Sequence, residues 1–210
     1  IGILGAIVAD RLGTSFARAL DGDLLPALGL ENTFVRVPKA RMADYAMGTA
    51  RDGSPTRVNP ALLAEEAYGV KSSVTDMTRF LAENLGTVSV DADLAAAFAR
   101  TRTAYADTAW YAQAMIWEGY AWPVERKTLE AGNSLDMAMK PQRQTPRTPP
   151  AVPAGAMLWN KTGSTGGFGA YVVLVPSEAL GVVVLANRGY PNPVRATATL
   201  DLIEALLAAN

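Results

Sequence analysis

The spacing of apolar residues changes near the middle of the chain. From residue 1 to about residue 105, apolar residues recur every three or four positions, which predicts amphipathic helices separated by long polar loops. The clearest of these helices follows Ser73, which fits a capping box with Asp76, and Gly86 is placed to end it. Its apolar stripe consists of Val74, Met77, Phe80, Leu81 and Leu85.

Beyond about residue 105 the pattern favours strands. An aromatic-rich stretch at residues 111–122 is typical of a strand, and two apolar runs, GAYVVLVP and GVVVLANR, flank the turn SEAL and predict an antiparallel hairpin. Residues 141–153 carry five prolines and predict an extended connection without a core of its own. An amphipathic helix is expected from about Pro193, with its apolar face toward the sheet.

These elements predict an α+β fold, in which a helical region joins an antiparallel β-sheet covered by a C-terminal helix. We divide the chain into residues 1–105, mostly helical with long loops, and residues 106–210, with the sheet and the terminal helix. The opening stretch IGILGAIVADRL is too short to span a bilayer and has no signal-peptide pattern. Its apolar residues lie on one helical face and predict a core helix: Ile1, Leu4, Val8 and Leu12.

Composition removes several classes of function. The 210 residues are half apolar and carry 19 basic against 20 acidic side chains, so nucleic acid and membrane surfaces are poor candidate partners. Cysteine and histidine are both absent, which excludes disulfides, a thiolate nucleophile, the Ser-His-Asp triad and the usual metal sites. We expect no metal and no organic cofactor.

The stretch WNKTGSTGGFGAYVVLVP, residues 159–176, carries the most distinctive chemistry. Lys161 adds positive charge, Thr162 adds a hydroxyl, and the glycines after them allow a ligand to approach the backbone of an edge strand. This combination suits a carboxylate and a developing oxyanion. The alternative is a glycine-rich turn with a solvated lysine. A phosphate-binding loop is disfavoured, because the lysine precedes the glycines.

Longer segments resemble one enzyme family. KTGSTGGFGAYVVLVPSEALGVVVLANRGYPNPVR resembles the C-terminal region of class C β-lactamases, AEEAYGVKSSVTDMTRFL is similar to their loop around a substrate-facing tyrosine, and IWEGYAWPV is similar to their Trp-Glu strand. Lys-Thr-Gly is one of the three motifs of serine β-lactamases and penicillin-binding proteins. The resemblance covers essentially the whole chain and implies a serine β-lactamase-like fold, a periplasmic location and a β-lactam as the small-molecule partner.

The resemblance also implies roles for individual residues. Lys161 would hold the substrate carboxylate and help to set the proton network, assisted by Thr162, and the backbone N–H of Ser164 would be an oxyanion donor. The other residues implied in the site are Gly163 at the substrate, Tyr68 in the side-chain pocket, Asn192 and Arg195 near the carboxylate, and Glu118 beside the motif lysine. Taken singly, three of these residues also fit ordinary positions, which composition alone favours: Tyr68 as a half-buried aromatic, Arg195 as a charge on a helix surface and Glu118 as an exposed strand residue.

The attacking group of the family is missing from these residues. No serine has a lysine three positions later, and the nearest match, SFAR at Ser15, ends in arginine, which cannot act as a base because it stays protonated. The one Tyr-x-Asn, at Tyr190–Asn192, lies in the segment that resembles the C-terminal region, and by the resemblance the family's own Tyr-x-Asn would fall just before Ile1. We therefore expect the C-terminal portion of a larger enzyme. Ser164 as a substitute nucleophile is disfavoured, because only Lys161 could activate it.

Three functions remain open at this level. The first is β-lactam hydrolysis by an acyl-serine mechanism. The second is an esterase or a D-amino peptidase of the same superfamily. The third is a non-catalytic fragment that only binds β-lactams. The absent part of the fold would leave apolar surface exposed, which predicts self-association or a complementing N-terminal chain.

Overall fold

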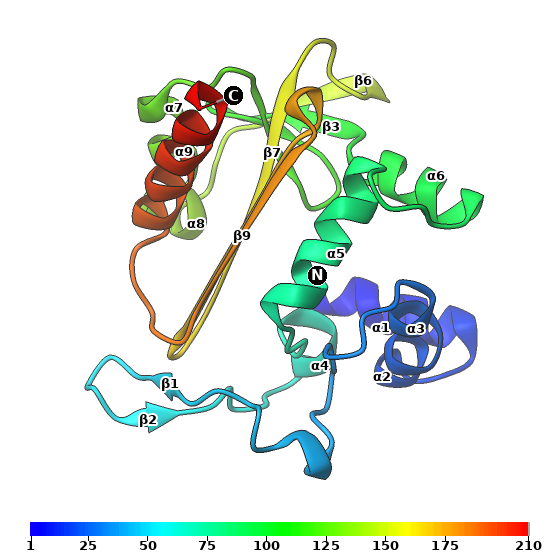
Figure 1. Cartoon of the computed structure of the whole chain (residues 1–210). Helices are drawn as coiled ribbons and strands as arrows, with labels where there is room; N and C mark the ends of the chain where they lie inside the picture. Colours follow the sequence, from blue (N-terminus) through cyan, green and yellow to red (C-terminus); the bar gives the residue numbers. More distant parts are fainter. Residues whose placement is uncertain (210) are drawn as a thin grey trace. The chain divides into compact units, whose positions relative to one another are not determined.

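A computed structural model describes residues 1–209 of the chain (Figure 1). The chain divides into two compact units, each built from several segments. The first unit comprises residues 1–80, 164–169 and 185–189, and the second comprises residues 81–163, 170–184 and 190–210. Each unit is described by itself.

The first unit is mainly helical. Besides a π-helical turn at Leu20–Leu24 and a 3-10 turn at Lys39–Arg41, its elements are α1 (Gly2–Leu12), α2 (Phe16–Ala19), α3 (Leu25–Ala27), β1 (Gly48–Thr49), β2 (Pro55–Thr56), α4 (Ala64–Ala67) and the first part of α5 (Val74–Leu85). The short strands β1 and β2 form an antiparallel pair.

The capping residues of α5 also hold the loop before it. The Oγ of Ser73 accepts a hydrogen bond from the Asp76 N–H at 3.1 Å, as a capping box requires. The Asp76 carboxylate does not reach back to Ser73. It is 97% buried and accepts hydrogen bonds from the N–H of Asn32 at 2.8 Å and from the hydroxyl of Thr33 at 2.7 Å. Asp76 thus ties a distant loop to the start of α5.

The predicted apolar face of α1 is not its buried face. Gly2, Gly5 and Ala9 are the buried residues of this helix. A Cβ on Gly5 would lie 2.7 Å from the Cβ of Glu66, so the two helices α1 and α4 approach closely at this glycine. The large apolar side chains remain exposed by 44–71%: Ile1, Ile3, Leu4, Ile7, Val8 and Leu12. The prediction of a core helix packed through these residues is therefore wrong.

The second unit is built on the sheet. Its remaining elements, besides a 3-10 turn at Pro176–Glu178, are α6 (Ala92–Thr101), β3 (Ala104–Asp107), β4 (Ala112–Gln113), β5 (Glu118–Ala121), α7 (Arg126–Gly132), α8 (Leu135–Met139), β6 (Thr145–Ala151), β7 (Met157–Thr165), β8 (Phe168–Val175), β9 (Leu180–Ala186) and α9 (Asn192–Ala208). The seven strands lie in the order β6-β3-β4-β5-β7-β8-β9.

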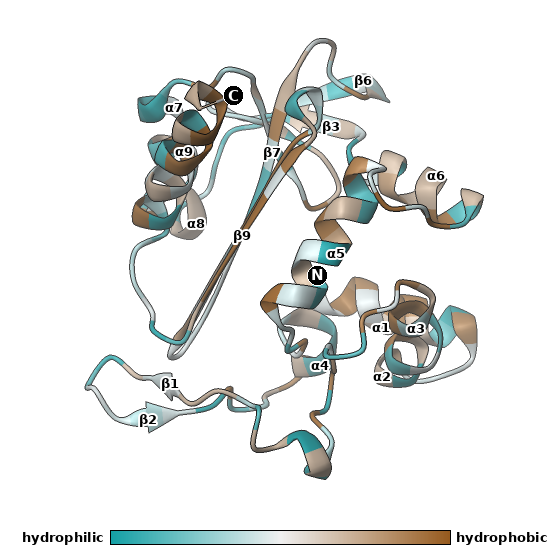
Figure 2. Cartoon of the chain, viewed as in Figure 1, coloured by the Kyte–Doolittle hydropathy of each residue, from teal (hydrophilic) through white to brown (hydrophobic). Residues whose placement is uncertain are grey.

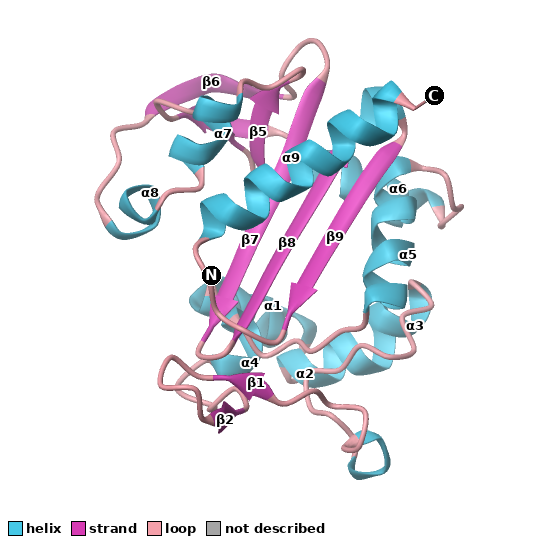
Figure 3. Cartoon of the chain, turned by 60° about the vertical axis from the view of Figure 1, so that its left-hand side comes forward, coloured by secondary structure: helices cyan, strands magenta, loops and turns pink. Residues whose placement is uncertain are grey.

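The hairpin predicted around SEAL is confirmed as β8 and β9, and the terminal helix as α9. Figure 3 shows α9 lying across β7, β8 and β9. Figure 2 shows hydrophobic residues concentrated along β9 and on part of α9. The apolar core includes residues of α9 itself and of the elements on which it packs: Tyr120, Leu129, Leu158, Tyr171, Val173, Val175, Ala196, Leu200 and Ile203. The α+β architecture predicted from the sequence follows from this packing.

The proline-rich segment contributes a strand, where the sequence predicts only a connection. Thr145–Ala151 forms β6 at one edge of the sheet and pairs antiparallel with β3, with Pro146 opposite Ala106. Proline has no backbone N–H to donate, but in an edge strand the missing donor can face solvent, where no neighbouring strand needs it. The edge position therefore explains why a strand with several prolines is tolerated here.

The strand that carries the Lys-Thr-Gly motif lies inside the sheet and not at its edge. Its pairing with β5 extends only from Met157 opposite Ala121 to Asn160 opposite Glu118. β7 then continues to Thr165 along β8. Lys161, Thr162 and Gly163 thus lie beyond the last residue of β7 that pairs with β5. On the side of β5, this part of β7 is therefore comparable to an edge strand.

Candidate active site

Lys161 lies in β7 beside a buried carboxylate. Its Nζ donates a hydrogen bond to Oε1 of Glu118 over 2.7 Å. The side chain of Lys161 is 40% exposed, whereas that of Glu118 is only 11% exposed, so Glu118 is not the exposed strand residue that the alternative interpretation proposed. An ammonium has three N–H donors, and the bond to Glu118 uses one of them. Lys161 can therefore hold its partner and still donate to an anion.

Burial dominates the electrostatics of Glu118. Its apolar surroundings raise the pKa of the carboxyl, and the ammonium of Lys161 opposes this rise through charge and hydrogen bonding. Burial also raises the pKa of Tyr111 to about 12, with a smaller contribution from the charge of Glu118. The pKa values of Tyr120 and Tyr171 are raised for the same two reasons. Lys161 is thus the group that favours the ionised form of Glu118.

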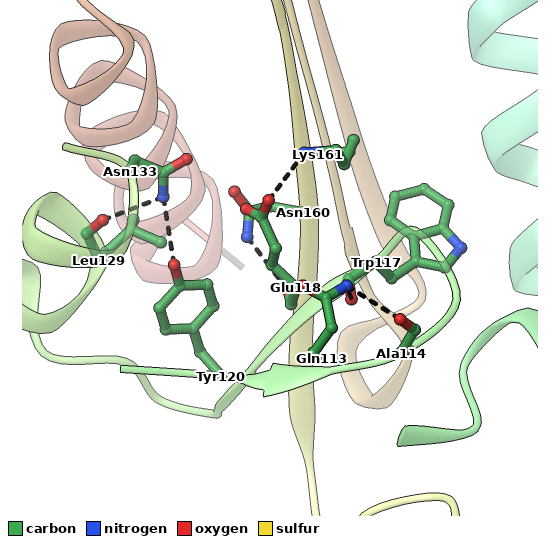
Figure 4. Close-up of polar contacts among 9 residues, drawn as sticks. All are labelled: Gln113, Ala114, Trp117, Glu118, Tyr120, Leu129, Asn133, Asn160 and Lys161. Carbon is green, nitrogen blue, oxygen red and sulfur yellow. Dashed lines mark hydrogen bonds and ion pairs between the residues drawn. The ribbon is translucent and has the colours of Figure 1, made fainter. Parts of the chain in front are cut away.

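Buried polar side chains that the sequence analysis did not single out lie beside this pair (Figure 4). Asn160 is fully buried, and its Nδ2 donates to the backbone carbonyl of Glu118 at 3.1 Å. The Nδ2 of Asn133 donates to the carbonyl of Leu129 at 3.0 Å and to the hydroxyl of Tyr120 at 3.4 Å. A polar residue within the apolar start of β7 is a signal that could have revealed Asn160. No local signal marks Asn133, because folding brings α7 and β5 together.

Arg195 is buried among backbone carbonyls. It is 1% exposed, and its Nη1 donates to the carbonyl oxygens of Gly163 and Ala170, both at 2.8 Å. Its Nη2 donates to the carbonyl of Tyr190 at 3.3 Å and to Oδ1 of Asn192. The interpretation of Arg195 as a charge on the helix surface is therefore wrong. The structure brings Gly163, Asn192 and Arg195 together at the start of α9.

Thr162 and Ser164 flank Gly163 in β7. Thr162 is partly buried, and Gly163 and Ser164 are exposed. A Cβ on Gly163 would meet only the Cβ of Ala170, at 3.6 Å, which is ordinary contact. Packing within the chain therefore does not require a glycine at this position. Ser164 is assigned to the first compact unit, although the same strand carries it.

Tyr68 lies in the first unit, directly after α4. Its side chain is partly open, with 37% of the residue exposed, and its hydroxyl accepts a hydrogen bond from the N–H of Ala61 at 3.0 Å. This bond closes the short loop before α4 and fixes the ring at the protein surface. The exposed ring provides a flat apolar surface, as a wall of a side-chain pocket would.

The residues around β7 can bind and polarise an acyl compound. An ammonium with unused donors suits a carboxylate, and exposed strand backbone beyond the paired part of β5 suits a carbonyl oxygen that gains negative charge. Within residues 1–209 no three acidic residues lie close enough together to hold a metal ion. In the same range, no helix is both long and apolar enough to cross a membrane.

Comparison with known proteins identifies the family. The family model described as Beta-lactamase matches residues 1–207. A beta-lactamase from Pseudomonas fluorescens is 42% identical over 206 residues, which are 98% of this chain and 58% of that protein. A crystal structure of a beta-lactamase from Sulfitobacter sp. EE-36 is 50% identical and superimposes with a TM-score of 0.97, covering 100% of this chain and 58% of the other.

A second crystal structure is that of a class C beta lactamase from Rhodobacter sphaeroides. It is 47% identical, with a TM-score of 0.95, and the match covers 99% of this chain and 59% of the other. The chain thus spans somewhat more than half the length of the proteins that it matches. The match of sequence and fold extends along nearly all of its residues, and the chain belongs to the β-lactamase family, with class C enzymes among its relatives.

Proposed function

We propose that the chain forms the wall of a class C β-lactamase that binds the substrate carboxylate and the oxyanion. In this reaction the β-lactam amide acylates a serine, and water then hydrolyses the acyl-enzyme. The observation that carries the proposal is the ammonium of Lys161 in β7, held at 2.7 Å from Glu118, with Gly163 and Ser164 two and three residues further along the strand. Membership of the β-lactamase family supports it.

Each site residue has a role in this proposal. Lys161 donates to the carboxylate of the β-lactam, and the hydroxyl of Thr162 adds a second donor there. The backbone N–H of Ser164 donates to the oxyanion of the tetrahedral intermediate. Gly163 lets the substrate approach the strand, and Tyr68 lines the pocket for the substrate's side chain. Asn192 and Arg195 shape the wall on which the carboxylate is bound.

The serine that is acylated comes from a polypeptide segment outside these residues. A serine hydrolase that lacks its nucleophile retains only about 10³-fold acceleration over water. The chain spans 58% of a related β-lactamase from Pseudomonas fluorescens, which leaves room for the S-x-x-K and Tyr-x-Asn motifs in the remaining part. On this proposal the 210 residues bind a β-lactam but hydrolyse it weakly.

The partner in this proposal is a chain segment that carries the remaining part of the family fold. The surface that this segment covers is formed by the exposed apolar residues of α1. Among them, Ile3 is 70% exposed and Ile7 is 59% exposed. Self-association through the same residues is the alternative in its absence. The location that follows from the class C resemblance is the periplasm, where β-lactams act.

The test is calorimetric titration of the 210-residue chain with a cephalosporin, together with a chromogenic cephalosporin assay. We expect binding, and we expect Lys161→Ala to weaken it at least tenfold because the charged donor to the carboxylate is lost. The control is Lys140→Ala, which removes a lysine whose ion pair with Asp136 is exposed. It should leave binding unchanged.

The outcomes separate the proposal from its alternatives. Binding that is weakened by Lys161→Ala and not by Lys140→Ala, with weak turnover, supports the proposal, and binding with no turnover at all favours the non-catalytic fragment. Turnover that survives Lys161→Ala shows that the named site is wrong. Turnover of esters or D-alanyl peptides without any cephalosporin binding favours the esterase or peptidase function. Light scattering with and without the N-terminal part of a class C relative shows which partner covers α1.

A further inference from the structure

We infer that Arg195 is a positioning residue, whose guanidinium fixes and polarises the peptide group between Gly163 and Ser164. Through that group it directs the Ser164 N–H toward an oxyanion. The inference rests on the proposed function in one respect only, the use of this N–H as the oxyanion donor. The contact of Arg195 with the Gly163 carbonyl does not depend on that proposal.

The guanidinium is matched to the oxygens around it. Its two terminal nitrogens carry four N–H groups, and four oxygens accept from them. Nη1 donates to the carbonyls of Gly163 and Ala170, each at 2.8 Å, and Nη2 donates to Tyr190 at 3.3 Å and to Asn192. The guanidinium carbon also lies 5.2 Å from the ring centre of Tyr190. Arg195 is thereby held in one position.

Burial prevents direct contact with a substrate carboxylate. Only 1% of Arg195 is exposed, and its terminal donors point at the backbone of β7 and β8. In this inference Arg195 acts on a bound substrate only through the strand that it holds. Its charge acts on the site through the peptide to which it is bonded.

The rigidity of the peptide group carries the effect to Ser164. The carbonyl of Gly163 and the N–H of Ser164 belong to one planar unit, and in a trans peptide they point to opposite sides. Nη1 of Arg195 bridges the carbonyls of Gly163 and Ala170, so the Gly163 carbonyl is directed toward β8. The Ser164 N–H is therefore directed toward the opposite side of β7, beyond the last residue paired with β5.

The hydrogen bond from the Arg195 guanidinium also makes the N–H of Ser164, in the same peptide group, a stronger donor. A hydrogen bond from a guanidinium draws electrons toward the Gly163 oxygen, and peptide resonance passes part of that shift to the nitrogen of Ser164. The effect is larger for a buried cation than for an exposed one, because water screens it less. An N–H polarised in advance stabilises an oxyanion better than one that must reorient during the reaction.

Arginine is required for this geometry. A lysine in place of Arg195 would present three donors at a single point and could not reach four oxygens on four different residues. Arg195→Lys therefore keeps the positive charge and removes the planar arrangement of N–H donors. The matched control is Arg126→Lys, because Arg126 also uses its guanidinium to bind another part of the chain, but does so at the protein surface, through an ion pair with Asp201.

Nuclear magnetic resonance of the complete 210-residue chain gives the direct readout. A hydrogen bond to a carbonyl deshields that carbonyl carbon and the nitrogen that follows it. In Arg195→Lys we expect the Gly163 carbonyl carbon and the Ser164 nitrogen to shift upfield together, while the Leu158 resonances stay in place as a reference for the fold. Arg126→Lys should shift neither.

Unchanged Gly163 and Ser164 resonances in a folded Arg195→Lys variant overturn the inference. If that variant does not fold, the wild-type chain still decides, through the scalar coupling across the hydrogen bond between Nη1 of Arg195 and the carbonyl carbon of Gly163. Absence of that coupling overturns the inference, and its presence supports it.

Cephalosporin titration of the same samples separates this inference from the proposed function. If the Ser164 resonances respond to Arg195→Lys but not to cephalosporin, the positioning contact stands and the oxyanion role fails. If they respond to cephalosporin but not to Arg195→Lys, the proposed function stands and the positioning role fails.

Discussion

Gly119 and Trp159 face each other across β5 and β7, and the indole of Trp159 covers the glycine. A Cβ on Gly119 would lie 2.4 Å from Cζ3 of Trp159, closer than any real contact. Trp159 is itself 98% buried, so it cannot move aside without disturbing the core. The pair lies directly beside the pair of Glu118 and Asn160, so its packing supports the strands that bring Glu118 and Lys161 together.

We expect Gly119→Ala to lower the free energy of unfolding of the second unit by about 1–3 kcal/mol, the usual effect of overpacking. All four tryptophans, at positions 110, 117, 122 and 159, lie in this unit, so urea unfolding followed by tryptophan fluorescence measures it. Gly163→Ala is the control in the same unit, since a Cβ there makes only an ordinary contact, 3.6 Å from the Cβ of Ala170. A loss no larger than that of the control would contradict the packing of Trp159 on Gly119.

The raised pKa of Glu118 predicts how stability changes with pH. A carboxyl whose folded-state pKa exceeds its ordinary value of 4.5 binds more protons in the folded state than in the unfolded state above that pH. Its contribution to stability is therefore complete at low pH and is lost as pH rises through the folded-state pKa. We expect the wild-type chain to lose stability relative to Glu118→Gln as pH increases from about 4.

Urea unfolding at several pH values, with the same fluorescence signal, checks this prediction. Glu125→Gln is a suitable control because Glu125 lies at the exposed start of α7. A gain in wild-type stability over the same pH range would mean that the attraction of Lys161 exceeds the desolvation of Glu118.

Asp76 and Ser73 should differ in how much they stabilise the first unit. Asp76→Ala leaves the N–H of Asn32 and the hydroxyl of Thr33 without their buried acceptor and should cost about 2–3 kcal/mol. Ser73→Ala removes only a helix cap and should cost about 1 kcal/mol. Amide hydrogen exchange of Asn32 gives a specific readout, which should accelerate in Asp76→Ala and change far less in Ser73→Ala. Equal acceleration of Asn32 exchange in the two variants would refute the role of Asp76 as the acceptor for this N–H.

Two neighbouring residues of α9 test the packing of this helix on the sheet. Ile203 is fully buried, whereas Leu202 is 48% exposed. Ile203→Ala creates a cavity and should lower the free energy of unfolding by about 2–5 kcal/mol. Leu202→Ala should cost clearly less, because less apolar surface is removed from the core. A similar loss in both variants, measured by fluorescence in urea, would place α9 in another rotation about its axis.

The fold could be predicted where local patterns decide the structure. The hairpin around SEAL, the capping residues of α5 and the position of α9 all follow from spacing and turn residues. The strand β6 could not be predicted, since prolines oppose a strand unless it lies at an edge, and edge position is a property of the complete sheet. The buried face of α1 could not be predicted either, because close contact with α4 selects Gly5 over the larger residues.

In the candidate site, too, some features could be predicted from the sequence and others could not. The composition around Lys161 predicts anion binding, and the resemblance to class C β-lactamases adds the other residues. The burial of Arg195 has no local signal, because its partners at Gly163, Ala170 and Tyr190 come from β7, β8 and the loop before α9. The burial of Glu118 depends similarly on Tyr111, Tyr120 and the strands around it.

The contact between Arg195 and Gly163 has a consequence for biosynthesis. Ribosomes synthesise β7 and β8 before α9, so the peptide between Gly163 and Ser164 exists before the cation that restrains it. That peptide acquires its final orientation only when the last helix docks. A nascent chain stopped before Arg195 would contain every residue of the Lys-Thr-Gly motif and still hold that peptide without its restraint.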